Sequence, residues 1–183
     1  MRKYVVLTIL FVLPLVVYLF FASGINHFAQ LPVLTNDVVD VSEYSEDTFK
    51  NKITVLGFFG NNVQDKHGDA LNLNQKIYKR FYQFKDFQFI MIQPKGTSEL
   101  TQNLRTDLKT GTDTDLINWK FISIEDDQLL EIFNSLKTNL SLDSNLGTPY
   151  VFIIDRDSNL RGRDDDGVKY GYDSRSVADI NNN

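Results

Sequence analysis

The sequence predicts a mixed α/β domain that follows one apolar N-terminal helix. Two observations carry the fold class. Strand-like and helix-like segments alternate along residues 51–163, and only a tight turn separates the last two strand-like segments. Alternation of this kind places helices on the faces of a central sheet, and the tight turn makes the last strand pair antiparallel. A third observation, a run of 19 uncharged residues near the N-terminus, sets that segment apart.

The N-terminal run covers residues 4–22 and follows Arg2 and Lys3. As a helix it extends about 28 Å, which matches the hydrocarbon thickness of a bilayer. Because both early positive charges precede the run, we expect the N-terminus inside and the rest of the chain outside the cytoplasm. We therefore predict a signal-anchor transmembrane helix over residues 1–24, single-pass in the cytoplasmic membrane, with a periplasmic domain. The alternative is a signal peptide that is cleaved near Ala22-Ser23-Gly24, where small residues suit a cleavage site.

Residues 25–50 contain glycine, asparagine and proline breakers, and they predict a linker with a short first strand over Val38–Val41. We expect the folded domain over residues 51–183. It opens with Ile53–Phe59, a run of mostly β-branched or aromatic residues that ends at a Gly-Asn-Asn turn. Such a run is typical of a buried strand.

Three helices and four further strands are expected after this first buried strand. In each helical segment, apolar residues recur every three or four positions, which is the spacing of one helix face. The strands are short runs rich in β-branched and aromatic residues. The expected helices cover residues 65–84, 97–108 and 126–140, and the strands cover residues 87–92, 119–124, 150–154 and 160–163.

Two segments near the C-terminus call for interpretation. Asp155, Asp157 and Asn159 have the spacing of the first ligands in a calcium loop, but Leu160 stands where that loop requires glycine. A β-turn is the simpler interpretation. Residues 173–180 are expected to begin a C-terminal helix that stays incomplete, which would leave part of one sheet face uncovered.

Composition excludes several classes of function. The chain contains no cysteine, which excludes disulfides, thiolate metal sites and thiol–disulfide chemistry. The net charge of -5 argues against nucleic acid as a partner, because phosphate binding requires a basic surface. The sequence contains no phosphate-binding glycine loop and no Gly-x-Ser-x-Gly motif, so it identifies no small-molecule substrate and no catalytic residue. We do not expect an enzyme.

Four motifs resemble the thioredoxin fold in their order and spacing: Lys52–Phe59, Trp119–Ile122, Thr148-Pro149 and Phe152–Gly162. Over residues 38–172 the chain most resembles the membrane-anchored branch that includes the SCO/SenC copper-assembly proteins. The resemblance implies a thioredoxin-like central mixed sheet with flanking helices. It also implies that Pro149 occupies the place of the family's cis-proline.

The resemblance places the family's chemistry at positions that this chain has changed. Laid on without gaps, the two cysteines of the family's Cys-x-x-x-Cys loop fall at Val63 and His67, and its copper-ligand histidine falls at Gly147. The chain is thus similar to a cysteine-less, divergent member of the branch. The family's redox reaction and its manner of binding copper would both be lost, because both depend on the thiols.

The candidate binding residues are Asp65, His67, Asp69, Thr148 and Pro149. His67 is the candidate metal ligand, since imidazole binds copper, and Asp65 or Asp69 would assist it. The opposing interpretation is a solvated loop histidine, because a single imidazole without organised partners binds metal poorly.

Three functions follow as expectations. The first is a non-redox binding or assembly module that is anchored in the membrane through residues 4–22, holds a protein partner and carries no cofactor. The resemblance links it to respiratory oxidase maturation. The second is an enzyme or a weak copper carrier with a rearranged site around His67. The third is a structural envelope protein.

Overall fold

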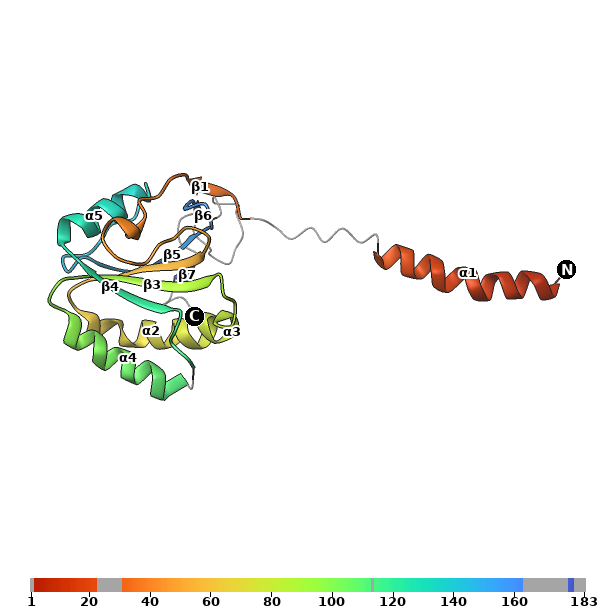
Figure 1. Cartoon of the computed structure of the whole chain (residues 1–183), viewed down its shortest axis with the longest axis horizontal. Helices are drawn as coiled ribbons and strands as arrows, with labels where there is room; N and C mark the ends of the chain where they lie inside the picture. The colour runs from red at the N-terminus through yellow and green to blue at the C-terminus, as the bar shows by residue number, and fades with distance from the viewer. Residues whose placement is uncertain (1, 23–30, 113, 163–177, 180–183) are drawn as a thin grey trace. The chain divides into compact units, whose positions relative to one another are not determined.

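The computed structural model describes residues 2–22, 31–112, 114–162 and 178–179. The chain divides into two compact units, Met1–Gln30 and Leu31–Asn183, and each is considered by itself (Figure 1).

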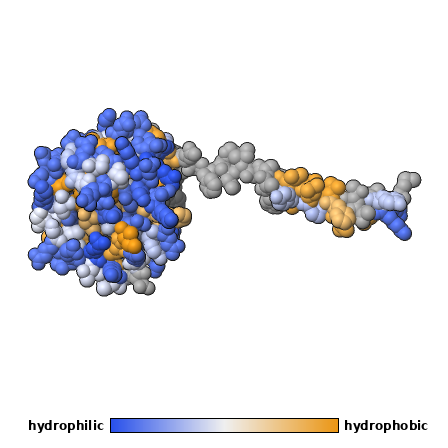
Figure 2. Space-filling view, viewed as in Figure 1, coloured by the Kyte–Doolittle hydropathy of each residue, from blue (hydrophilic) through white to orange (hydrophobic). Residues whose placement is uncertain are grey.

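The first unit contains the helix α1, which spans Arg2–Ala22 and continues through Pro14. Within the described part of the chain, it is the one helix long and apolar enough to cross a membrane by length and composition. A signal sequence, or a core helix of a soluble protein, meets the same criterion. Figure 2 shows apolar residues along this helix, whereas the visible face of the second unit is mostly hydrophilic.

The second unit is built on a mixed sheet whose strand order is β1-β6-β5-β2-β3-β4, with β7 paired to β5. The strands β2, β3 and β4 are parallel neighbours, and β5 runs antiparallel to β2. The bounds are β1 Val33–Thr35, β2 Ile53–Phe59, β3 Phe87–Pro94, β4 Trp119–Ile124, β5 Gly147–Ile154, β6 Leu160–Arg161 and β7 Ala178–Asp179.

Helices cover both faces of this sheet (Figure 1). The helix α5 (Asp126–Ser135) lies on one face, and the helices α2, α3 and α4 lie on the other. A π-helical turn joins α2 to α3, and a 3₁₀ turn precedes α2. These elements are η2 Val63–Lys66, α2 His67–Leu73, η3 Asn74–Tyr78, α3 Lys79–Phe81 and α4 Ser98–Thr112.

A hydrophobic core fills each side of the sheet. Successive strand residues point to opposite faces, so Val55 of β2 joins the core beneath α2 and α4 while Leu56 joins the core beneath α5. Phe89 and Trp119, with ring centroids 4.6 Å apart, dominate the first core. Phe58 and Phe152 lie in the second.

The expected strand over Val38–Val41 is wrong. The first strand is instead Val33–Thr35, and Val41–Glu43 forms a 3₁₀ turn, η1. The carboxylate of Asp40 accepts hydrogen bonds from the backbone N–H groups of Ser42 and Phe49, which compete with a strand ladder. The segment expected as linker therefore packs into the domain from Leu31 onward, with Val38, Val41 and Phe49 buried in the core.

The other elements agree closely with the sequence expectation. The strands β2 and β4 have the predicted bounds, and the antiparallel pair of β5 and β6 is confirmed. The last central helix was expected to reach Leu140 but ends at Ser135. Lys137 has a positive φ of 52°, and a left-handed residue there stops the helix.

Most of the C-terminal helix expected over residues 173–180 lies outside the described residues. Ala178 and Asp179 are described, and for them the expectation is wrong, because they form the strand β7. Ala178 pairs with Val151 and Asp179 with Tyr150, both antiparallel.

Candidate functional site

The position where the resemblance places the family's chemistry is a pair of loops at the carboxyl end of β2. One loop, residues 60–62, follows β2, and the other, residues 143–146, precedes β5. The N–H of Asn61 donates to the carbonyl oxygen of Asn145 at 2.8 Å. Gly60 has a φ of 67°, and a Cβ added there would lie 2.7 Å from the backbone nitrogen of Gly147. The two loops, which we call the loop pair, are therefore in backbone contact.

Asp143 closes the second loop of this pair. Its Oδ1 accepts hydrogen bonds from the backbone N–H groups of Asn145 at 2.8 Å and Gly147 at 2.9 Å. The N–H of Asp143 donates in turn to the carbonyl of Gly147 at 2.8 Å. This geometry satisfies the loop's backbone groups internally and favours a rigid loop.

Val63, where the sequence resemblance places the family's first cysteine, is buried in the core. A residue at this position that faces the core presents no side chain to a reactant. The whole sequence contains no cysteine, so this end of β2 has no thiol for thiol–disulfide chemistry.

His67 occupies the second cysteine position and begins α2. Its Nε2 lies 3.1 Å from Oδ2 of Asp107, which belongs to α4. Both side chains are roughly half exposed, at 43% and 57%, so the pair contributes about 1 kcal/mol or less to stability. The pair ties the start of α2 to α4.

The structure does not bring Asp65 to His67. The carboxylate of Asp65 accepts a hydrogen bond from the side-chain amide of Asn62. Asp69 lies in the first turn of α2 and is half-buried. Within the described ranges, no three His, Asp or Glu side chains are grouped so that they could hold a metal ion.

Thr148 and Pro149 belong to the start of β5. Thr148 is buried, and its hydroxyl lies 3.4 Å from the backbone nitrogen of Tyr150. The described residues contain no cis peptide bond, so the cis-proline that the resemblance implied at Pro149 is wrong. Pro149 is half-buried and is the third residue of β5, the strand that follows the closed loop of Asp143.

The opposite end of β5 is closed in the same way, by Asp155. Its Oδ1 accepts from the N–H groups of Asp157 and Asn159, each at 2.9 Å, and its Oδ2 accepts from Nε of Arg161 at 2.6 Å. Burial of the carboxyl group raises its pKa, but the hydrogen bonds from Asn159, Arg161 and Asp157 outweigh burial and lower the pKa from 3.8. The β-turn expected here is confirmed.

Sequence reasoning missed Asp107 and Asp143. Asp107 is 40 residues from His67 in the sequence, and no local sequence pattern predicts a contact over that separation. Asp143 could have been found, because Asp143, Ser144 and Asn145 are turn-forming residue types of the kind that predicted the Asp155 turn.

Comparisons with known proteins concern the fold. No family model matches the chain, and no curated protein matches it. The thioredoxin domain of a thiol-disulfide oxidoreductase from Bacteroides vulgatus is 15% identical, with a TM-score of 0.44, covering 73% of this chain and 84% of that one.

Two Sco proteins are similar to the same degree. BsSco, a member of the Sco family of cytochrome c oxidase assembly proteins, is 13% identical with a TM-score of 0.47, covering 72% of this chain and 85% of that one. A SCO1/SenC family lipoprotein from Bacillus anthracis is 14% identical with a TM-score of 0.43, covering 75% and 86%. At such identities and TM-scores, the likeness assigns no residue of this chain a role.

The chain has a mixed α/β fold with helices on both faces of one sheet, as the sequence predicted. Its neighbours among solved structures include thiol-disulfide oxidoreductases and Sco proteins. The narrower identification as a cysteine-less SCO member stays a prediction.

Proposed function

We propose that this protein is a membrane-anchored binding module with a thioredoxin-like domain outside the cytoplasm, and that it works without redox chemistry. One observation carries the proposal. The loop pair keeps a rigid, exposed rim at the carboxyl end of β2, while Val63, which follows the first loop directly, is buried in the core. Exposed loops positioned by a rigid sheet are common binding surfaces.

The rim of the loop pair is the surface that we assign to a protein partner. Asn61, Asn62, Ser144 and Asn145 are exposed there, and their side chains offer amide and hydroxyl groups. These four residues are uncharged, and the exposed Asp143 is the single charged residue of the loop pair, so hydrogen bonds and shape would contribute most to the recognition of a partner.

Site-specific photo-crosslinking in cells tests this surface. A photoreactive amino acid at Asn61 or Ser144 should give a discrete crosslinked species, whereas the same residue at the exposed Ile117 should not. Equal crosslinking from all three positions would contradict the proposal. The absence of any crosslinked species from Asn61 and Ser144 would favour the structural envelope protein.

A role beside respiratory oxidase maturation is the narrower form of the proposal, and the sequence resemblance supports it. The expected partner is then a heme-copper oxidase subunit or a protein that assembles one. Mass spectrometry of the species crosslinked at Asn61 decides this point. A partner set without any respiratory component would contradict the oxidase link and leave the binding module intact.

Copper carriage around His67 is the competing function, and a titration separates the two. The pairing of His67 with Asp107 supplies two donor groups, and among the described residues no third His, Asp or Glu joins them, so the site is weak. We expect Cu²⁺ to bind the chain no more tightly than it binds the His67→Ala variant in calorimetry. Micromolar or tighter binding that His67→Ala abolishes would instead favour the copper carrier.

A further inference from the structure

An apolar pocket of about 540 Å³ opens at the other end of β2 from the loop pair. Its floor is the sheet face formed by β2 and β5, where Val55 pairs with Ile153. Directly paired residues of antiparallel strands project to the same face. The residues that line the pocket are Ile53, Val55, Ile77, Phe81, Phe84, Lys85, Asp86, Phe87, Val151, Ile153 and Arg156.

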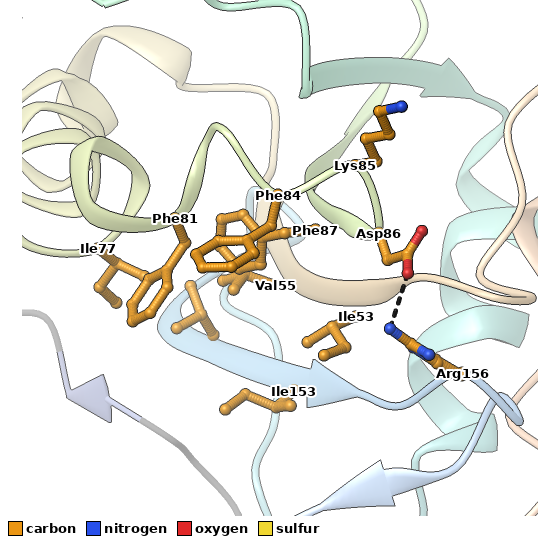
Figure 3. Close-up of a pocket in the computed structure, with 11 residues that line it drawn as sticks. Ile53, Val55, Ile77, Phe81, Phe84, Lys85, Asp86, Phe87, Ile153 and Arg156 are labelled. Carbon is orange, nitrogen blue, oxygen red and sulfur yellow. Dashed lines mark hydrogen bonds and ion pairs between the residues drawn. The ribbon is translucent and has the colours of Figure 1, made fainter.

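Three phenylalanines form the wall of this pocket beside α3. Phe81 lies with its ring centroid 6.2 Å from that of Phe84 and 5.6 Å from that of Phe87 (Figure 3). Phe84 is 62% exposed, Phe81 43%, and Ile53 on the floor 42%. Large apolar side chains gathered around one concavity and left exposed are typical of a ligand site.

The polar groups of the pocket gather at one end. Ile77 lies at the far end, and the ion pair between Arg156 and Asp86 lies beside Ile53 (Figure 3). The Nη2 of Arg156 donates to Oδ2 of Asp86 at 2.7 Å, which leaves further N–H donors on the same guanidinium. An apolar trough that ends in a guanidinium matches an alkyl chain with an anionic head group.

The net charge at this end is positive. Lys85 and Arg156 line the pocket with a single acid, Asp86, and the side chain of Lys85 points away from the apolar residues (Figure 3). Lys52 adds a third cation, because its Nζ donates to the carbonyl oxygen of Lys85 at 2.6 Å. Residues 31–162 as a whole are acidic, with 14 Lys and Arg against 19 Asp and Glu. A local excess of positive charge on an acidic domain attracts an anion to this end of the pocket.

We propose that the pocket binds a long-chain carboxylate of the fatty-acid type, with its alkyl chain against Phe81, Phe84 and Val55 and its carboxylate at Arg156. This binding is independent of the protein partner assigned to the loop pair. It requires no redox chemistry and no cofactor.

Photo-labelling of the full chain in phosphatidylcholine vesicles tests the proposal. The probe is a hexadecanoic acid that carries a diazirine on its chain, and peptide mapping locates the label. We expect the label on residues 77–87 or 151–156. The Phe84→Glu variant should lose most of the labelling, while the matched variant Ile117→Glu, at an exposed apolar position outside the pocket, should keep it.

Competition by unlabelled compounds measures separately how the alkyl chain and the head group contribute to binding. Each methylene that the pocket buries strengthens binding about fourfold, so the free concentration for half displacement should fall about fifteenfold from octanoate to decanoate. Dodecanoate should displace the probe better than 1-dodecanol does, and Arg156→Gln should remove that difference.

Two results would overturn the proposal. One is label spread over the surface in proportion to exposure, with no response to Phe84→Glu. The other is labelling of the pocket only after residues 163–183 are removed, which would assign the pocket to the chain's own C-terminal residues. Tryptophan fluorescence of Trp119, the single tryptophan of the chain, checks that each variant is folded.

Discussion

At the scale of single residues, Gly60 is the contact point of the loop pair. Its φ of 67° lies in the left-handed region, and the backbone of Asn145 and Gly147 fills the space where a side chain would stand. We expect Gly60→Ala to lower the free energy of unfolding by about 1–3 kcal/mol. The added methyl group would strain the left-handed backbone and would also clash with the backbone of Asn145 and Gly147. Denaturant unfolding measures the loss.

Gly68 offers the matched control for that substitution. It lies in the first turn of α2, and a Cβ added there meets nothing within 4 Å. Gly68→Ala should leave stability unchanged or raise it by up to about 1 kcal/mol. If both variants lost equal stability, the close contact at Gly60 would not be what holds the loops together.

Asp155 gives a prediction about pH. Its pKa is lowered in the folded state, so its carboxylate stabilises the fold above pH 3.8, and this stabilisation is lost as the pH falls through the lowered pKa. Asp155→Asn should cost about 1–3 kcal/mol at neutral pH, since charge-assisted hydrogen bonds are weakened. The difference from the unmodified chain should shrink below pH 3.8.

Unfolding measured from neutral pH into the acid range tests this dependence. Asp157→Asn is the control, because Asp157 is an exposed acid of the same turn. A loss of stability in Asp155→Asn that stays constant with pH would show that the carboxylate charge has no part in it.

At the scale of elements, Tyr78 connects the π-helical turn to the loop before β4. Its hydroxyl donates to the carbonyl oxygen of Asp115 at 2.7 Å and accepts from the N–H of Asn118 at 3.1 Å. Burial raises the pKa of the phenol, and the N–H bond from Asn118 opposes that rise. The hydroxyl thus satisfies two backbone groups of a segment 37–40 residues away.

We expect Tyr78→Phe to destabilise the domain by about 1–3 kcal/mol, because the substitution leaves both backbone groups without this partner. Hydrogen exchange should show faster exchange at Asn118, whose N–H loses its acceptor. Tyr82→Phe is the comparison variant, since Tyr82 is less buried and its hydroxyl accepts from the neighbouring Gln83 at 3.3 Å. Equal effects in both variants would contradict a special role for Tyr78.

At the scale of the whole molecule, the apolar helix and the folded domain belong to two different units of the chain. The unit Met1–Gln30 holds the apolar helix α1, and the unit Leu31–Asn183 holds the sheet and both cores. The proposed orientation follows from Arg2 and Lys3 at the start of α1.

Reporter fusions to the C-terminus test that orientation in a bacterial host. Alkaline phosphatase, which folds only outside the cytoplasm, should be active, and green fluorescent protein exported by the same route should stay dark. The fusion should sediment with membranes after an alkaline wash. Replacing Arg2 and Lys3 by glutamate should reduce phosphatase activity. A soluble, active fusion would favour the cleaved signal peptide.

The sequence by itself determined the strands β2 to β6 and the helices between them. Ile53–Phe59 and Trp119–Ile124 are short apolar runs bounded by turns. A pattern of this kind predicts a strand from the local sequence alone, without knowledge of the residues that pack against it. The Asp155 turn was equally local, because all its backbone donors lie within four residues of the carboxylate. The absence of cysteine, and with it the loss of thiol chemistry, also needed no structure.

Tertiary structure decided the rest, because it depends on contacts between distant residues. The sequence over Val38–Val41 predicted a strand. In the structure, the carboxylate of Asp40 accepts a hydrogen bond from the N–H of Phe49, and the segment bends so that Val38 and Val41 are buried in the core. His67 pairs with Asp107, which is 40 residues away in the sequence, and does not pair with its sequence neighbour Asp65. The apolar pocket is also tertiary. Phe84 and Ile153 look like ordinary core residues in the sequence, and only the folded arrangement of α3, the segment after it and the strands β2 and β5 leaves a cavity between them.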